Sequence, residues 1–522
     1  MLVSCDRRQY SPGPVNTNGV QSRIPCSKGE THMTTTKVRR VGALLVGLAL
    51  VAAACGSDSK DTATTSAATT PPTEAPVATD APADTTAATD APADTTAATD
   101  APADTTADTT ADTTAPATGN GELAGMKGTT PLVELSQDFK DRLDGSEAAK
   151  ATPLGGTYNY AAETYDAIVV IALAADIAKT DGSAFADEIV GVTKDGTKCT
   201  TYADCLALVT AGTDIDYDGF SGPMTMNGNG EPLEASYGIL QFGADNRLDD
   251  ALTTYVTAAA PDSAVKPLTK TDVPREGDGE LKIGSILPQT GSLAFLAPPE
   301  FAGAELAVND INDAGGALGK PVVFVPGDSG DTSTDIASQE VDRLLGENVD
   351  AIIGAASSSV TLTVIDKITA AGVVQFSPAN TSLKLVDYPD HSLYFRDAPP
   401  DDLQGNVVAQ LVADDGNSSA YILALDDAYG TSLADVIEAG LTSAGVEVLG
   451  KKIYDPKATS FDAEVDEIAA ADPDAIILIT FDEGSRILKT MVEKGIGPNA
   501  KAVYGCDGNI GNALGENFNA GK

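Results

Sequence analysis

Residues 281–288 read LKIGSILP, residues 299–316 read PEFAGAELAVNDINDAGG, and residues 321–328 read PVVFVPGD. The first and third stretches are short and apolar, which predicts strands. The middle stretch repeats apolar residues at helical spacing and ends in a glycine pair, which predicts a helix that stops there. A strand, a helix and a second strand in this order predict two parallel strands of one sheet.

The same alternation continues along the rest of the chain. Further strands are predicted at 349–355, 373–379, 392–399, 419–427, 446–454, 475–481 and 501–507. Further helices are predicted at 334–347, 358–372, 407–416, 429–445, 461–473 and 483–495. The predicted fold class is therefore α/β, with parallel sheets flanked by helices. Such sheets bind ligands at the carboxyl ends of their strands, which here carry GAASSS (354–359), FSPANTS (376–382), DDAYG (426–430), TFDEG (480–484) and GCDGN (505–509).

The composition excludes several classes of partner and site. The 522 residues include 76 acidic and 33 basic ones, a formal charge of −43. A polyanion repels nucleic acid, so no nucleic-acid partner is expected. Only two histidines occur, His32 and His391, and no His/Cys group has the spacing of metal ligands. No catalytic dyad stands out either, so we expect no metal, no cofactor and no catalytic residues.

The N-terminal region contains an export signal. Residues 33–55 read MTTTKVRRVGALLVGLALVAAAC, a basic stretch followed by an apolar run too short to span a membrane. We interpret 33–54 as a signal peptide and Met33 as the start, which makes 1–32 a non-native upstream extension. The ending AAAC resembles a bacterial lipobox, which implies a lipid on Cys55 and a position on the outer face of the cell membrane. The alternative is an ordinary cleaved signal with an incidental cysteine.

Residues 55–118 are a linker. They consist almost wholly of Ala, Thr, Asp, Pro and Ser, and the unit ATDAPADTTA recurs every ten residues. With almost no large apolar residue, this stretch cannot bury a core and is predicted to be disordered.

Two regions resemble the type I periplasmic-binding-protein family, in its leucine/isoleucine/valine-binding group. In 280–522 the resemblance rests on the opening strand, the NDIN-AGG helix end, the G-x-x-SSS strand end, the SPA-N-T turn and the D-x-x-YG turn. This region resembles the N-terminal two-thirds of the family's fold. Residues 119–256 resemble its C-terminal third, through LAGMKGTTP, YNYAAETYDAIVVIALAADIA, GTDIDYDGFSGPMTMNGNGEP and YGILQFGADNR. The resemblance implies two lobes with a ligand cleft between them.

The order of the two regions is inverted relative to the family. A circular permutation is one explanation, in which 257–279 would connect the family's old termini. A truncated tandem array and an error in sequence assembly are the other two. On the first explanation the two regions form a single two-lobed domain, a monomer with three crossings as its hinge.

The resemblance also implies a ligand site for a small amino acid or amide. It places the ligand carboxylate at Ser357, Ala379 and Thr381, and the ammonium at Asp507. Aromatic rings that close over the ligand would be Tyr429 and Phe481, with Phe295 near the first loop. Helix N-termini and hydroxyl groups suit a carboxylate.

Simpler roles compete with these assignments. Ser357 is also placed to cap a helix, and Asp507 is also consistent with a solvated turn residue. Phe481 and Asp507 stand where the group often has Tyr and Glu, which weakens the case for a strictly leucine-type ligand.

The remaining cysteines are assigned by their setting. Cys199 and Cys205 lie in TKCTTYADC, and in an exported protein this spacing predicts a small local disulfide. Cys506 is predicted to be a free thiol beside the ligand.

Our leading hypothesis is a solute-binding protein that delivers amino acids, branched-chain ones first, to an ABC transporter permease. The alternatives are a ligand-sensing receptor module and an amide- or urea-binding protein of the same fold. An enzyme ranks third.

Overall fold

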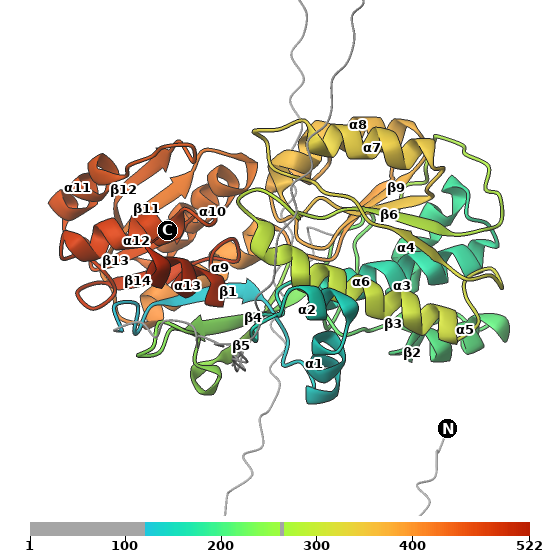
Figure 1. The fold of residues 1–522 in the computed structure, drawn as a ribbon, viewed down its shortest axis with the longest axis horizontal. Coiled ribbons are helices and arrows are strands. Elements are labelled where there is room, and N and C mark those ends of the chain that lie inside the picture. The colour runs from blue at the N-terminus through green and yellow to red at the C-terminus, as the bar shows by residue number, and fades with distance from the viewer. Residues whose placement is uncertain (1–120, 261–265, 522) are drawn as a thin grey trace, which may run out of the picture. The chain divides into compact units, whose positions relative to one another are not determined.

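The computed structural model describes residues 121–260 and 266–521, which form α/β structure around two sheets (Figure 1). The smaller sheet has five parallel strands in the order β10-β9-β8-β6-β7. Their bounds are β6 Lys282–Ile286, β7 Val323–Val325, β8 Ala351–Gly354, β9 Val374–Ser377 and β10 Tyr394–Arg396. Within the described residues, we call this sheet and its helices the first lobe.

The helices of the first lobe come from two separate stretches of the chain. One group is α6 Ala297–Asp313, α7 Ile336–Gly346 and α8 Ser358–Ala370, and the other is α1 Gln137–Asp144, α2 Glu147–Ala151, α3 Ala161–Ala178, α4 Ala186–Val192 and α5 Tyr202–Thr210. Helices α3 and α6 pack so closely that a Cβ on Gly303 would lie 2.1 Å from the Ala161 carbonyl oxygen. Strands β2 Thr197–Cys199 and β3 Ile215–Tyr217 form a small parallel sheet, and α5 connects them in the sequence.

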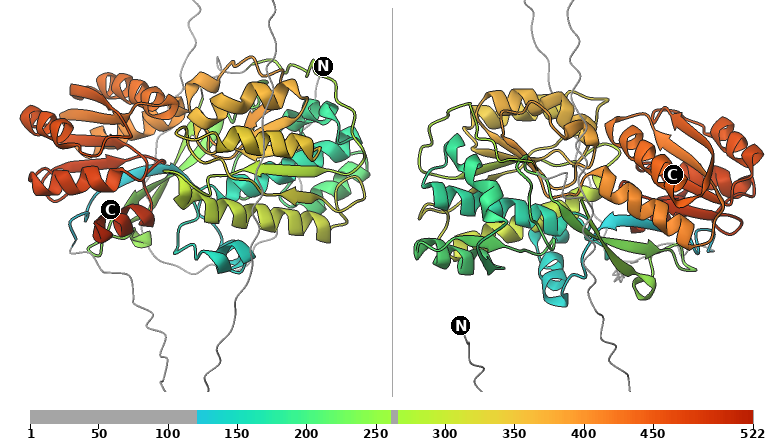
Figure 2. Two further views of the ribbon diagram at one scale, coloured as in Figure 1. Left: turned by 45° about the horizontal axis from the view of Figure 1, so that its top comes forward. Right: turned by 180° about the vertical axis from the view of Figure 1, so that it is seen from behind.

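The larger sheet has seven strands in the order β12-β11-β13-β14-β1-β4-β5 and forms the core of the second lobe. Their bounds are β1 Lys127–Pro131, β4 Glu234–Gln241, β5 Thr254–Ala259, β11 Ser419–Leu425, β12 Glu447–Tyr454, β13 Ala475–Ile479 and β14 Ala502–Gly505. Lys127 pairs with Tyr504 on one side and with Gln241 on the other, so β1 joins a strand of the 280–522 region to a strand of its own 119–256 region. Helices α9 Asp401–Asp414, α10 Ala428–Ala444, α11 Asp462–Ala471, α12 Gly484–Glu493 and α13 Asn512–Ala520 belong to this lobe (Figure 2).

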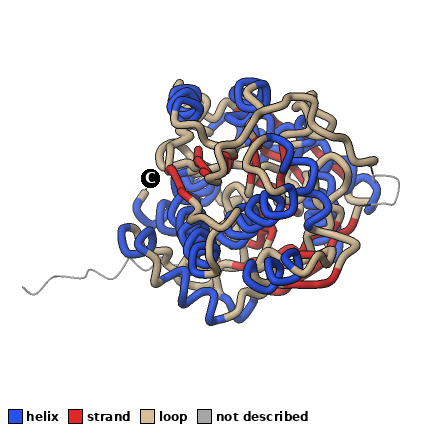
Figure 3. Tube along the Cα trace, turned by 90° about the vertical axis from the view of Figure 1, so that its right-hand side faces the viewer, coloured by secondary structure: helices blue, strands red, loops and turns tan. Residues whose placement is uncertain are grey.

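The predicted α/β class and the parallel strands of 280–522 are confirmed, and Figure 3 shows helices around the strands. Two details of the prediction are wrong. Helix α9 begins at Asp401 rather than at 407, because Pro400 ends the extended segment and two acidic residues favour the first turn. The second sheet is mixed, because β4 and β5 run antiparallel to their neighbours.

Three described connections link the lobes: residues 132–136, 218–233 and 397–400. The connector after β5 also reaches the first lobe. The Thr271 backbone N–H donates to Asp187 at 2.9 Å, and Arg275 pairs with Asp350 at 2.7 Å. No helix within the described ranges is long and apolar enough to cross a membrane.

Candidate functional site

The N-terminus of α8 forms one wall of the candidate site. Strand β8 ends at Gly354, and Ser357 caps the helix by accepting a hydrogen bond from the Val360 backbone N–H at 3.3 Å. The capping role considered for Ser357 is therefore present, and the residue lines the cavity as well. Because a helix N-terminus carries a partial positive charge and free N–H groups, this wall suits an anionic group.

Asp507 forms the opposite wall, in the turn that follows β14. Its carboxylate accepts hydrogen bonds from the Tyr160 hydroxyl at 2.7 Å and from the Tyr429 hydroxyl at 2.8 Å. The side chain is buried, with 4% of its surface exposed, so it is not the solvated turn residue of the simpler interpretation. Burial raises the pKa of Asp507, although the two tyrosine hydroxyls oppose that rise.

Two aromatic rings cover Asp507. The rings of Tyr429, on α10, and Phe481, after β13, stack with their centroids 5.6 Å apart and their planes 10° apart. The Gly508 backbone N–H donates to the Tyr429 hydroxyl at 3.1 Å. A Cβ on Gly508 would lie 2.9 Å from the Tyr429 ring, so glycine keeps this approach open.

The two walls enclose a cavity of about 20 Å³, enough for one water molecule. Its lining comes from both lobes: Tyr160, Leu293, Leu296, Ala356, Ser357, Ser358, Ala379, Tyr429, Phe481, Asp507 and Gly508. A neighbouring cavity of about 150 Å³ shares Leu293, Ser357 and Phe481 with it. A ligand would enter only after the lobes separate.

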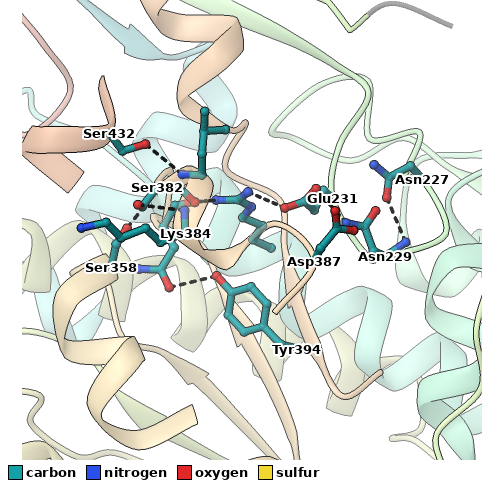
Figure 4. Close-up of polar contacts among 12 residues, drawn as sticks. Asn227, Asn229, Glu231, Ser358, Ser382, Lys384, Asp387, Tyr394 and Ser432 are labelled. Carbon is teal, nitrogen blue, oxygen red and sulfur yellow. Dashed lines mark hydrogen bonds and ion pairs between the residues drawn. The ribbon is translucent and has the colours of Figure 1, made fainter. Parts of the chain in front are cut away.

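Direct contacts hold the lobes together beside the cavity. The Ala428 backbone N–H donates to the Ser359 hydroxyl at 2.8 Å, and the Ser382 hydroxyl donates to the Ala428 carbonyl at 2.7 Å. The Ser432 hydroxyl accepts from the Leu383 backbone N–H at 2.9 Å; Figure 4 shows Ser432 and Ser382 side by side. The structure is therefore that of a closed cleft.

A buried ion pair joins two of the connections between the lobes. Arg396, at the end of β10, pairs with Glu231 of the 218–233 connection, and the Arg396 side chain is 0% exposed. The guanidinium also donates to the carbonyls of Asn380 at 3.2 Å and Ser382 at 3.0 Å. Figure 4 shows Glu231 between Ser382 on one side and Asn229 and Asn227 on the other.

The structure brings together five of the seven predicted ligand residues, namely Ser357, Ala379, Tyr429, Phe481 and Asp507. It does not place Thr381 or Phe295 on the cavity wall. Thr381 turns toward α9, where its carbonyl accepts the Asp401 N–H at 2.8 Å. Phe295 lies in the short turn η4 Ala294–Leu296 and packs on the second-lobe core, and the residues on either side of it, Leu293 and Leu296, line the cavity instead.

Sequence reasoning missed Tyr160, although it is the residue that fixes one oxygen of Asp507. Tyr160 precedes α3 with a positive φ of 60°, and 347 positions separate it from Asp507. One feature of the sequence could have pointed to Tyr160: it stands at the start of a helix in YNYAAETYDA, one of the stretches that resemble the family.

The other predicted sites are reported briefly. Cys199 and Cys205 form a disulfide, and Cys506 is a buried free thiol. Among the described residues, no group of His, Cys, Asp and Glu is arranged to hold a metal ion. Cys55 and the segments 1–32, 33–54 and 55–118 lie outside the described residues.

Part of the chain is similar to one family of known proteins. Residues 280–518 match the family described as periplasmic binding protein. "Leu/Ile/Val-binding protein homolog 7" of Brucella abortus is 27% identical over 238 residues, which cover 44% of this chain and 59% of that protein. "Chemotactic signal transduction system substrate-binding protein BasB" of Halobacterium salinarum is 30% identical over 205 residues, covering 38% and 49%.

Among solved structures, the branched-chain amino acid transporter substrate binding protein LivJ of Streptococcus pneumoniae, in complex with isoleucine, is 26% identical with a TM-score of 0.41. The match covers 46% of this chain and 67% of LivJ. The chain thus matches about half to three-fifths of the length of the two sequence relatives.

Proposed function

Because residues 280–518 match the family described as periplasmic binding protein and are similar to Leu/Ile/Val-binding proteins, we propose that this chain is an exported solute-binding protein. It captures an amino acid, with branched-chain amino acids as the first candidates, and delivers it to an ABC transporter permease. It binds its ligand and does not transform it.

One observation carries the proposal. A buried acid, Asp507 of the second lobe, faces the N-terminus of α8 of the first lobe across a closed cavity. An α-amino acid carries an ammonium and a carboxylate a few ångströms apart, and the two walls are complementary to these charges. Exclusion of water by Tyr429 and Phe481 strengthens each charged contact. Only the closed form offers both walls, so the ligand stabilises closure.

The test is isothermal titration with leucine, valine, alanine, glutamate and urea. The Asp507→Ala protein leaves a bound ammonium without its partner, and we expect a loss of roughly 2–4 kcal/mol, or about thirty- to a thousandfold in affinity. Asp313→Ala removes an exposed carboxylate at the end of α6 and serves as the control with unchanged affinity. If urea binds best and Asp507→Ala binds it equally well, the amide-binding alternative replaces amino-acid capture.

The likeness to a chemotactic substrate-binding protein supports a second candidate, a receptor that reports its ligand to a signalling partner. The two functions differ in a deletion strain. Loss of uptake of the labelled ligand supports transport, whereas normal uptake with a lost behavioural response supports sensing.

We also propose that Cys55 carries the lipid anchor. The basic stretch and apolar run of 33–54 and the cysteine that follows support it. Mass spectrometry of the mature protein should find acyl chains on an N-terminal Cys55, and the Cys55→Ser protein should be released into the medium. An unmodified Cys55 contradicts this proposal and leaves ligand capture untouched.

A further inference from the structure

A second buried carboxyl group lies behind Asp507 at the hinge. Asp401 is the first residue of α9 and directly follows the 397–400 connection between the lobes. Its side chain is 0% exposed, and among the described residues neither of its carboxyl oxygens makes a hydrogen bond of normal geometry. A buried ionised carboxylate without such partners is costly, so this group favours its protonated form.

Asp401 lies where the lobes meet. Its backbone N–H donates to Thr381 of the first lobe, and the hydroxyls of Thr381 and of Ser432, in the second lobe, lie beside its carboxyl and lower its pKa. Burial outweighs them and raises the pKa of Asp401 to about 7, and the charge of Asp507 adds to that rise. The two carboxyl groups therefore oppose each other's ionisation.

The surroundings contain little positive charge. The ionisable groups near Asp401 are Asp507, Cys506, Tyr237, Asp402, Arg396 and, across its ion pair with Arg396, Glu231. Arg396 is the cation of this set, and Glu231 already neutralises it. Gln404, one turn after Asp401 on α9, donates to the Thr129 carbonyl at 3.1 Å, and its side chain lowers the pKa of Asp507. The first turn of α9 therefore carries both Asp401 and a side chain that acts on Asp507.

We propose that Asp401 is a positioning residue for ligand capture: its buried carboxyl group holds a proton in the empty site, and an ammonium group that binds Asp507 causes that proton to be released to solvent. This inference rests on the proposed function, because it needs a cationic group at Asp507.

The expected pH dependence has a definite sign. A bound ammonium stabilises the ionised forms of both carboxyl groups, so the complex holds fewer protons than the empty site. Affinity therefore rises with pH until the pKa of about 7 has been passed. We expect binding at pH 6 to be about tenfold weaker than at pH 8, because each pH unit changes affinity at most tenfold per proton released.

The test is titration calorimetry with the tightest-binding amino acid of the panel, at pH 6, 7 and 8, in two buffers of different ionisation enthalpy. The difference between buffers counts the protons released. The unmodified protein should release close to one proton at pH 6 and almost none at pH 8. Asp401→Asn should release at most half as much at pH 6, and its affinity should hardly change with pH. Asp414→Asn, an exposed carboxylate in the last turn of α9, is the matched control and should behave like the unmodified protein.

The melting temperature of the ligand-free protein tests proton uptake by Asp401 without any ligand. Because the pKa of Asp401 in the folded protein exceeds its ordinary value of 3.8, its contribution to stability is lost as pH rises from about 4 through 7. The melting temperature of the unmodified protein should fall across this range relative to that of Asp401→Asn. If the unmodified protein and Asp401→Asn bind tightly and release equal numbers of protons, the role of Asp401 is overturned and ligand capture stands. Absence of binding by every amino acid overturns the proposed function, and parallel melting curves overturn proton uptake by Asp401.

Discussion

At the scale of single residues, the site is organised around one carboxylate and two tyrosine hydroxyls. Tyr160, just before α3 of the first lobe, and Tyr429, on α10 of the second lobe, each donate to a different oxygen of Asp507. Both hydroxyls are buried, and burial beside Asp507 raises their pKa values, so they remain donors at every physiological pH. They orient the carboxylate and stabilise its charged form.

Replacement of Tyr160 tests this arrangement. Tyr160→Phe removes one hydroxyl donor and keeps the ring, so an ionised Asp507 loses one charge-assisted hydrogen bond. We expect amino-acid affinity to fall by about 1.5–3 kcal/mol, roughly ten- to 150-fold, in titration calorimetry. Tyr158→Phe is the control, since the Tyr158 hydroxyl bonds to Asp144 at the surface. Equal affinities of the two variants would show that Tyr160 does not support Asp507.

At the scale of elements, the connections between the lobes are tied by the Arg396–Glu231 pair. A buried guanidinium whose partner is removed is left as an uncompensated charge, and its Nε already makes no hydrogen bond. Loss of this pair should therefore destabilise the packing of β10 against the 218–233 connection. The cost in free energy should exceed that of losing an ion pair at the surface.

Glu231→Ala should lower the free energy of unfolding by about 3–5 kcal/mol in urea titrations. Asp435→Ala breaks a contact of Lys451 at the surface, where Lys451 keeps Glu438 as a second partner, and should cost less than about 1 kcal/mol. If the two variants are equally stable, the buried pair does not hold the hinge together.

At the scale of the whole molecule, we propose that the inverted order is a circular permutation. Strand β1 lies between β14 and β4, so the two regions that resemble opposite ends of the family's fold share one sheet. Asn246 also ties residues from far apart in the chain. Its side chain accepts from the Leu123 N–H at 3.0 Å and donates to Asn519 at 2.8 Å, so the end of the 280–522 region lies beside the start of the 119–256 region, as the family's order requires.

A reordered protein tests the permutation. Residues 280–521, a short glycine-serine linker and residues 121–260 restore the family's order. We expect one cooperative unfolding transition and the same ligand affinity as residues 121–521, because the contacts between the two regions form again; the melting temperature should be lower, because contacts of the omitted connector such as Arg275 with Asp350 are lost. An aggregated product, or two separate transitions for residues 121–521, contradicts a permuted single domain and favours a truncated array or an assembly error.

The sequence by itself determined the elements and much of the candidate site. Apolar periodicity is a local signal, so the strands and helices of 280–522 could be read from it, and parallel strands bring their carboxyl ends to one edge. This places Ser357, Tyr429 and Asp507 at strand ends that meet. The resemblance to a family supplied their expected roles.

Only the tertiary structure decided which side chains reach the cavity and how the two regions combine. The Tyr160 hydroxyl bonds to Asp507, which lies 347 positions away in the sequence. Thr381 bonds through its carbonyl to the Asp401 N–H and does not line the cavity. The antiparallel pairing of β4 with β1, more than a hundred positions away in the chain, also depended on the assembly of the sheet. Such contacts arise when lobes and strands are assembled, and a side chain's direction within a turn carries no periodic signal in the sequence.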